Sequence, residues 1–273
     1  GEPVNWGFSA YVLGGMNTDY PGSLMGVSGN VGVDLSGLSV APTASYQLSP
    51  AFAVGASVLL GYARLETENI PGSGSKSDSA TGWGVKLGAN WDVSKTVALG
   101  VTVQPKMYMS KMDSFCNDPI FAGTDCEVSL PDLYGIGSRF ALSEKAVFVA
   151  DIVQAQWSDV EVFNSGSAFS PRWEDQTIFK LGMEFHAGEG TIYRVGYNHG
   201  DSPVPDNRVA NNVFFPAVTE DHLSAGFTKR FGGTELIGYY AYVFENEQTQ
   251  AGATAPRIKM NQNALGIGGN WKF

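Results

Sequence analysis

The sequence predicts an all-β protein, an antiparallel up-and-down transmembrane β-barrel with about 12 strands. Apolar residues alternate with polar or small residues along most of the chain, which is the period of a strand with two different faces. Short turns and long polar segments follow one another in strict alternation between these strands. Only 16% of the residues are charged and 34 are glycines, whereas an average soluble domain has about 25% charged residues.

The two-faced pattern is clearest in residues 82–93. The odd residues from Trp83 to Val93 are apolar, whereas the even residues from Gly84 to Asp92 are small or polar. An amphipathic helix would repeat every 3.6 residues instead. The same alternation occurs in the segments 131–142, 177–187, 221–231 and 263–273.

The connections predict the orientation of the strands. Short turns occur at 48–51, 93–95, 142–145, 187–190 and 231–234. Longer polar segments rich in Gly, Pro and Asn lie near 14–34, 67–80, 111–128, 164–172, 201–219 and 249–257. The strands between them would have roughly 10–15 residues, enough to cross a bilayer at a tilt. All short turns then lie at the periplasmic end, and all long loops lie outside the cell.

The charges on the small and polar face favour a membrane barrel over a soluble barrel or sandwich. A closed soluble core would not accept so many charged side chains, whereas the wet lumen of a membrane barrel does. The aromatic face would then contact lipid, with Trp271 and Phe273 in the periplasmic aromatic girdle. The charged residues on the lumen face are Lys86, Lys180, Glu184, His186, Arg194 and Arg230.

Several other classes of protein are disfavoured. The net charge of −10 argues against a nucleic-acid partner. The most apolar run, residues 51–63, is too short for a transmembrane helix. None of the 3 histidines has a second ligand at metal-binding spacing, so neither a metal nor another cofactor is expected. The segment 198–202 (NHGDS) has catalytic residue types, but neighbours on an extended chain point to opposite faces, so no enzyme is predicted.

Cys116 and Cys126 lie close together in a polar segment that contains Pro and Gly. This arrangement predicts a loop disulfide, and two free thiols are the alternative. A disulfide would imply an oxidising compartment, and the strand count places this loop on the extracellular side.

The segment DSPVP (201–205), followed by Arg208, Pro216 and residues 221–231, resembles the long-chain fatty-acid outer-membrane transporter family, of the FadL and toluene-transporter type. The resemblance covers nearly the whole chain, and other segments that fit are 6–22, 38–66, 129–140 and 173–185. It implies the bacterial outer membrane as the location.

Family members have 14 strands and begin with an N-terminal plug. Neither the plug nor the first two strands have a counterpart in this sequence, so residues 1–273 are expected to form a single barrel domain. Either residues before Gly1 are missing, or the protein is a shortened member. The last strand is expected to close the barrel by pairing with the first, and its terminal Phe273 resembles the signal read by the barrel-assembly machinery.

The resemblance implies passive uptake of hydrophobic compounds, either long-chain fatty acids or aromatic and aliphatic hydrocarbons. The ligand would enter between the extracellular loops and leave sideways through the barrel wall. Gly14 and Gly15 fall at the position of the inward kink that forms this lateral opening, and glycines mark strand bends; the alternative is that they simply start a loop.

Two positions that resemble the family's basic carboxylate contacts are occupied by Asn69 and Phe169, which are not basic. Arg64 and Arg172 are the nearest substitutes for binding a fatty acid, although Arg64 could instead face lipopolysaccharide at the rim. Apolar loop residues could line the access groove. They include Leu24, Met25, Phe169, Phe214 and Phe215.

Two other functions remain as alternatives. The protein could be a general diffusion porin for polar solutes, or an adhesion or structural barrel that acts through its loops. The expected partners are hydrophobic small molecules or fatty acids, outer-membrane lipid, lipopolysaccharide and the barrel-assembly machinery.

Overall fold

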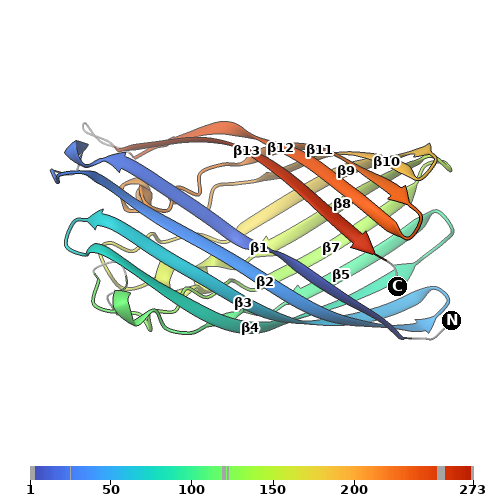
Figure 1. The fold of residues 1–273 in the computed structure, drawn as a ribbon, viewed down its shortest axis with the longest axis horizontal. Helices are drawn as coiled ribbons and strands as arrows, with labels where there is room; N and C mark the ends of the chain where they lie inside the picture. Colours follow the sequence, from blue (N-terminus) through green and yellow to red (C-terminus); the bar gives the residue numbers. More distant parts are fainter. Residues whose placement is uncertain (1–3, 25, 119–120, 122, 251–255, 272–273) are drawn as a thin grey trace.

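A computed structural model describes residues 4–24, 26–118, 121, 123–250 and 256–271. They form one antiparallel sheet that wraps around an interior, with the strands tilted against the long axis (Figure 1). The strands are β1 (Val4–Pro21), β2 (Asn30–Ser49), β3 (Phe52–Ile70), β4 (Gly74–Asp92), β5 (Val97–Gln104), β6 (Tyr108–Met109), β7 (Leu133–Ala141), β8 (Ala146–Ala155), β9 (Gln176–Gly188), β10 (Thr191–Gly200), β11 (Asp221–Phe231), β12 (Thr234–Thr249) and β13 (Arg257–Trp271).

The sheet has 13 strands, and all of them except β6 pair in sequence order, so 12 strands form one path. Strand β6 pairs only with β4. The predicted all-β, up-and-down antiparallel architecture of about 12 strands is therefore confirmed. Five short 3₁₀ helices occupy the connections among the described residues: η1 (Gly22–Leu24), η2 (Asp113–Phe115), η3 (Trp157–Asp159), η4 (Glu161–Phe163) and η5 (Val209–Asn212). None of these is long and apolar enough to cross a membrane.

The alternation of the sequence becomes the difference between the two faces of the sheet. Apolar side chains on the outer face are strongly exposed, for example Trp83 at 62% and Ile267 at 80%. The inner face carries ion pairs: Glu184 accepts a hydrogen bond of 2.8 Å from Arg194, and Arg230 Nε lies 2.5 Å from Glu235 Oε1. This distribution suits a lipid-facing exterior with a polar interior.

Strands β1 to β4 are longer than the sequence predicts. They contain 18, 20, 19 and 19 residues instead of roughly 10–15. The segments 14–34 and 67–80, expected as long loops, are largely strand, and only residues 71–73 separate β3 from β4. Their polar composition suggested loops, but the ladder continues through polar cross-strand partners, such as Asp34 with Glu66.

The expected pairing between the last strand and the first is not present in the described residues. Strands β1 and β13 are the two edges of the sheet, and each pairs with one neighbour only. Both edges lie on the same side of the molecule in Figure 1. In lipid, the backbone groups of both edges require hydrogen-bond partners, because the bilayer core supplies none.

The apolar core lies toward the end of the sheet that carries the longer connections, opposite the end with the two termini (Figure 1). Side chains from these connections pack against the inner face of β2 and β3. They include Met107, Met112, Phe115, Val160, Val209, Phe215 and Val218. The loops therefore fill the mouth of the sheet instead of standing away from it.

Candidate functional site

A cavity of about 400 Å³ lies beneath these loops, on the inner side of the sheet. Its walls come from β1, β2 and β3, from the loop between β5 and β7, from the loop between β8 and β9, and from the region of β9 to β11. The lining residues are Leu13, Gly14, Gly15, Met16, Leu35, Ser36, Gly37, Ala63, Met109, Val128, Ser129, Leu130, Trp157, Phe163, Trp173, Gln176, Ile178, Asn198, Gly200, Pro203, Ala217, Thr219, Glu220 and His222. Its size and mainly apolar lining suit a small hydrophobic ligand.

A β-bulge in β1 forms the first wall. Val12 pairs with Leu38 and Gly14 pairs with the next residue of β2, Gly37, so Leu13 is an extra residue in β1. A Cβ atom built on Gly37 would lie 3.2 Å from the Cβ of Leu13, which places Leu13 on the inner face. A bulge bends its strand and interrupts the ladder, so the wall is weakest where the cavity touches it.

Three aromatic side chains from the loop between β8 and β9 form the second wall. The rings of Phe163 and Trp173 are stacked, with their centroids 4.1 Å apart. Trp157 meets Trp173 edge to face at a centroid distance of 4.9 Å. Edge-to-face and offset contacts are the favoured arrangements of aromatic pairs, so these rings stabilise one another as a rigid apolar surface.

Asn212, the last residue of η5, holds this aromatic wall in place. Its Oδ1 accepts a hydrogen bond of 2.6 Å from Trp173 Nε1, and its Nδ2 donates to the carbonyls of Pro171 and Arg208 at 3.0 and 2.9 Å. Asn212 is completely buried. One amide side chain therefore joins the loop before β9 to the loop before β11.

The loop between β5 and β7 forms the third wall through Met109, Val128 and Leu130. Cys116 and Cys126 in this loop form a disulfide with a Cα–Cα distance of 5.1 Å, which confirms the sequence-based prediction. The ring closed by this bond stabilises the fold by about 3 kcal/mol in the chain-entropy model.

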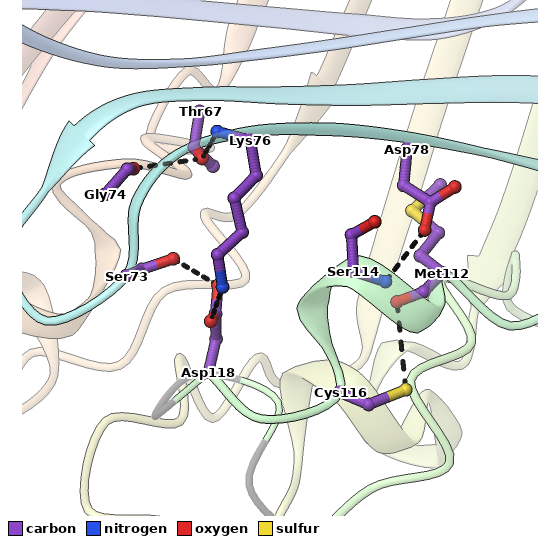
Figure 2. Close-up of polar contacts among 9 residues, drawn as sticks. All are labelled: Thr67, Ser73, Gly74, Lys76, Asp78, Met112, Ser114, Cys116 and Asp118. Atoms are coloured by element: carbon purple, nitrogen blue, oxygen red, sulfur yellow. Dashed lines mark hydrogen bonds and ion pairs between the residues drawn. The ribbon is translucent and has the colours of Figure 1, made fainter.

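Polar contacts fix the same loop against the hairpin of β3 and β4 (Figure 2). Asp118 is 5% exposed; it forms an ion pair with Lys76 and accepts a hydrogen bond from the Ser73 hydroxyl. The backbone N–H of Ser114 donates to Asp78 at 2.9 Å. This hydrogen bond lowers the pKa of the Asp78 carboxyl, near the loop end of β4.

Glycines in the wall allow the loop to approach closely. A Cβ on Gly61 would lie 2.3 Å from Met107 Cε, and one on Gly82 would lie 2.3 Å from the carbonyl oxygen of Tyr108. Because backbone atoms cannot move aside as easily as a side-chain end, Gly82 is needed for β6 to reach β4.

A polar strip completes the cavity on the side of β9 to β11. Gln176 donates to the carbonyl of Asp201 at 2.7 Å, and Glu220 accepts from the backbone N–H of Ser202 at 3.2 Å. Asn198 and His222 are paired across β10 and β11 and also line the cavity. Of the described residues in the lining, none is Lys or Arg, and Glu220 is the single carboxylate.

The residues expected to bind a carboxylate lie elsewhere. Arg64 lies on the outer face, where its side chain is 52% exposed and forms an ion pair with Glu66. Arg172 is an exposed loop residue with a left-handed φ of 59°, beside a separate polar hollow near Asp175 and Arg208. Neither lines the cavity, and their binding role stays a prediction.

The apolar loop residues expected at the access groove are dispersed. Phe215 is buried against Phe163 at a centroid distance of 6.1 Å, whereas Phe214 contacts Tyr20 at 6.4 Å. Phe169 is 59% exposed. Leu24 ends η1, and Met25 and Phe273 lie outside the described residues.

Gly14 and Gly15 do line the cavity, next to the bulge. Their assignment as a lateral opening remains a prediction.

Sequence reasoning missed the aromatic wall and Asn212. Trp157, Phe163 and Trp173 occur within a polar segment that has no period-two pattern, so no strand face connects them. One sequence signal could have revealed the wall: three large aromatic residues occur in a loop that is otherwise polar. Such residues are expected to pack against other apolar groups. Within the described part of the chain, no group of His, Cys, Asp and Glu side chains is suited to hold a metal ion.

Removal of the disulfide tests how far the third wall depends on it. The double substitution Cys116→Ser and Cys126→Ser is expected to loosen the loop between β5 and β7, because the bond restricts its unfolded states by about 3 kcal/mol. Hydrogen exchange of residues 105–132 should rise at least tenfold, while the strands exchange at the wild-type rate. Equal exchange in this loop with and without the bond would contradict the expectation.

A family model described as "Outer membrane protein transport protein (OMPP1/FadL/TodX)" matches residues 1–263. Comparison with curated proteins finds no match.

Solved structures share the fold at low sequence identity. The toluene transporter TodX of Pseudomonas putida matches with a TM-score of 0.72 and 17% identity, over 100% of this chain and 80% of that chain. The toluene transporter TbuX of Ralstonia pickettii gives a TM-score of 0.69 and 16% identity, over 99% and 78%. A FadL homologue of Pseudomonas aeruginosa gives 0.71 and 14%, over 98% and 74%.

Proposed function

The chain belongs to the outer membrane protein transport family (OMPP1/FadL/TodX), and from this premise we propose that its cargo is an uncharged, mainly aromatic, hydrophobic molecule. Members of this family are transport channels of the outer membrane of Gram-negative bacteria and not enzymes. The observation that carries the proposal is the cavity itself, with an aromatic wall and no cationic side chain among its described lining residues.

The lining argues against a fatty-acid anion as the main cargo. A buried carboxylate requires a cationic or hydrogen-bond-rich partner, and this cavity offers the carboxylate of Glu220 instead. Two structurally similar proteins, TodX and TbuX, are toluene transporters. An aromatic hydrocarbon is compatible with the stacked rings of Phe163 and Trp173 and needs no ionic partner.

The proposed route starts at the loop end, passes through the cavity and leaves sideways at the bulge beside Gly14 and Gly15. Deeper in the interior the inner face carries charged pairs such as Arg194 with Glu184. An apolar ligand gains no stabilisation there, whereas transfer from water to lipid is worth about 0.8 kcal/mol per CH₂ group. A lateral route avoids that charged interior.

Uptake measurements test the proposal. Bacterial cells that express the full chain should take up radiolabelled toluene at least several-fold faster than cells without it, and oleate at the background rate. Ala63→Phe should reduce toluene uptake about tenfold, because Ala63 lines the cavity and the ring would fill it. Ala89→Phe is the matched control, because Ala89 lies on β4 and its side chain is on the outer face of the sheet.

If oleate is taken up faster than toluene, the proposed aromatic cargo is wrong and the cargo is a fatty acid. Liposomes that become permeable to sugars in the presence of the protein would instead indicate a diffusion porin. The loop side chains that fill the mouth of the sheet, such as Phe115 and Phe215, argue against such an open pore.

Two partners belong to the same proposal. Lipopolysaccharide would contact the exposed outer rim, where Arg64 lies. The barrel-assembly machinery would insert the β-sheet into the outer membrane. Both follow from a location in the outer membrane.

A further inference from the structure

Asn198 and His222 form a polar pair in a cavity whose lining is mainly apolar. They are direct cross-strand partners on β10 and β11. The next cross-strand pair, Tyr197 with Leu223, is exposed on the outer face, with fractions of 42% and 50%. Since successive strand residues face opposite sides, the Asn198 and His222 side chains point into the interior, where both line the cavity.

The other two side chains of the polar strip are each held by a hydrogen bond. Gln176 bonds to the carbonyl of Asp201, and Glu220 bonds to the backbone of Ser202. Within the described part of the chain, no hydrogen bond engages the side chain of Asn198 or of His222, although each faces a cavity. An amide and a neutral imidazole each offer both a donor and an acceptor.

Resting on the proposed function, we propose that Asn198 and His222 bind the hydroxyl group of an uncharged phenol, while the aromatic wall holds its ring. A hydroxyl group both donates and accepts, so it matches the mixed capacity of this pair. A carboxylate would meet the charge of Glu220 in the same cavity. Lys180 is the partner of Asn198 on β9, but it does not line the cavity and its in-register neighbour on β8 is Asp151.

The pair is expected to favour a phenol over an apolar ligand because only the phenol supplies hydrogen bonds to Asn198 and His222. Toluene would remove water from Asn198 and His222 without replacing its hydrogen bonds, and an unpaired buried polar group is costly. A phenol of the same shape replaces them. Sites that hydrogen-bond a hydroxyl group discriminate against the analogue that lacks it more strongly than apolar pockets discriminate by size.

The test compares 4-methylphenol with toluene, which differ by one hydroxyl group. Calorimetric titration of the full chain in lipid nanodiscs, corrected with empty nanodiscs, should give about tenfold tighter binding of 4-methylphenol. Asn198→Leu and His222→Phe should each reduce this preference about tenfold and leave toluene affinity unchanged or improved. Asn90→Leu, an inner-face position of β4 outside the cavity, is the matched control with a wild-type preference.

His222→Gln retains a donor and an acceptor and should keep most of the preference. If Asn198→Leu does not fold, the comparison of His222→Phe with His222→Gln decides the question. Equal affinity of the wild type for both ligands, or a preference unchanged in the variants, would overturn the inference and leave the proposed function standing. If neither ligand binds, the proposed function fails together with the inference.

Discussion

Deletion of Leu13 is expected to reduce uptake of the hydrophobic cargo at least tenfold while the sheet still forms. Leu13 is the extra residue of the β1 bulge, because Val12 and Gly14 pair with consecutive residues of β2. Its removal restores a continuous ladder between β1 and β2 at the place where the cavity reaches the wall. The proposed lateral exit would then be closed.

The chain provides a matched control for this deletion. Between β12 and β13 the register shifts in the same way, since Val243 pairs with Gln262 and Asn246 with Met260. Deletion of Glu245 removes that irregularity, which does not border the cavity. Uptake of toluene by the Glu245 deletion should match the wild type, and circular dichroism should show equal strand content for both deletions. Wild-type uptake without Leu13 would exclude an exit through the bulge.

Asn212→Leu is expected to disorganise the aromatic wall and to weaken ligand binding at least tenfold. The substitution leaves the buried indole N–H of Trp173 and the carbonyl of Pro171 without this partner, whereas the carbonyl of Arg208 still accepts from the backbone N–H of Asn211. Each such buried group costs about 1–3 kcal/mol. Hydrogen exchange of residues 156–175 and 201–219 should rise, and calorimetry should show the loss of affinity.

The neighbouring Asn211 provides the same substitution at the surface. Its amide donates to the carbonyl of Ala168 at 2.8 Å in an exposed position, so Asn211→Leu should change exchange and affinity little. Trp173→Phe removes the indole N–H together with the five-membered ring of the indole. A double-mutant cycle between Trp173→Phe and Asn212→Leu should give a coupling of about 1–2 kcal/mol. Independent, additive effects would show that Asn212 does not act through Trp173.

Much of the fold could be predicted because a strand imposes a strict period of two on any sequence that has one lipid face and one polar face. The alternation from Trp83 to Val93 and the short turns between strands therefore predicted the sheet, its order and its two faces. The spacing of Cys116 and Cys126 predicted the disulfide. The lengths of β1 to β4 were not predicted, because a polar composition permits either a loop or a strand whose two faces both meet water.

The site divides in the same way. The resemblance predicted a strand kink at Gly14 and Gly15, and the sequence by itself determined that Asn69 and Phe169 supply no cationic group. The tertiary structure decided that Trp157, Phe163 and Trp173 meet as one wall, that Asn212 fixes them, and that Asn198 and His222 face the cavity. The physical reason is that loop residues have no period; long-range packing and hydrogen bonds, which leave no local pattern in the chain, bring them together.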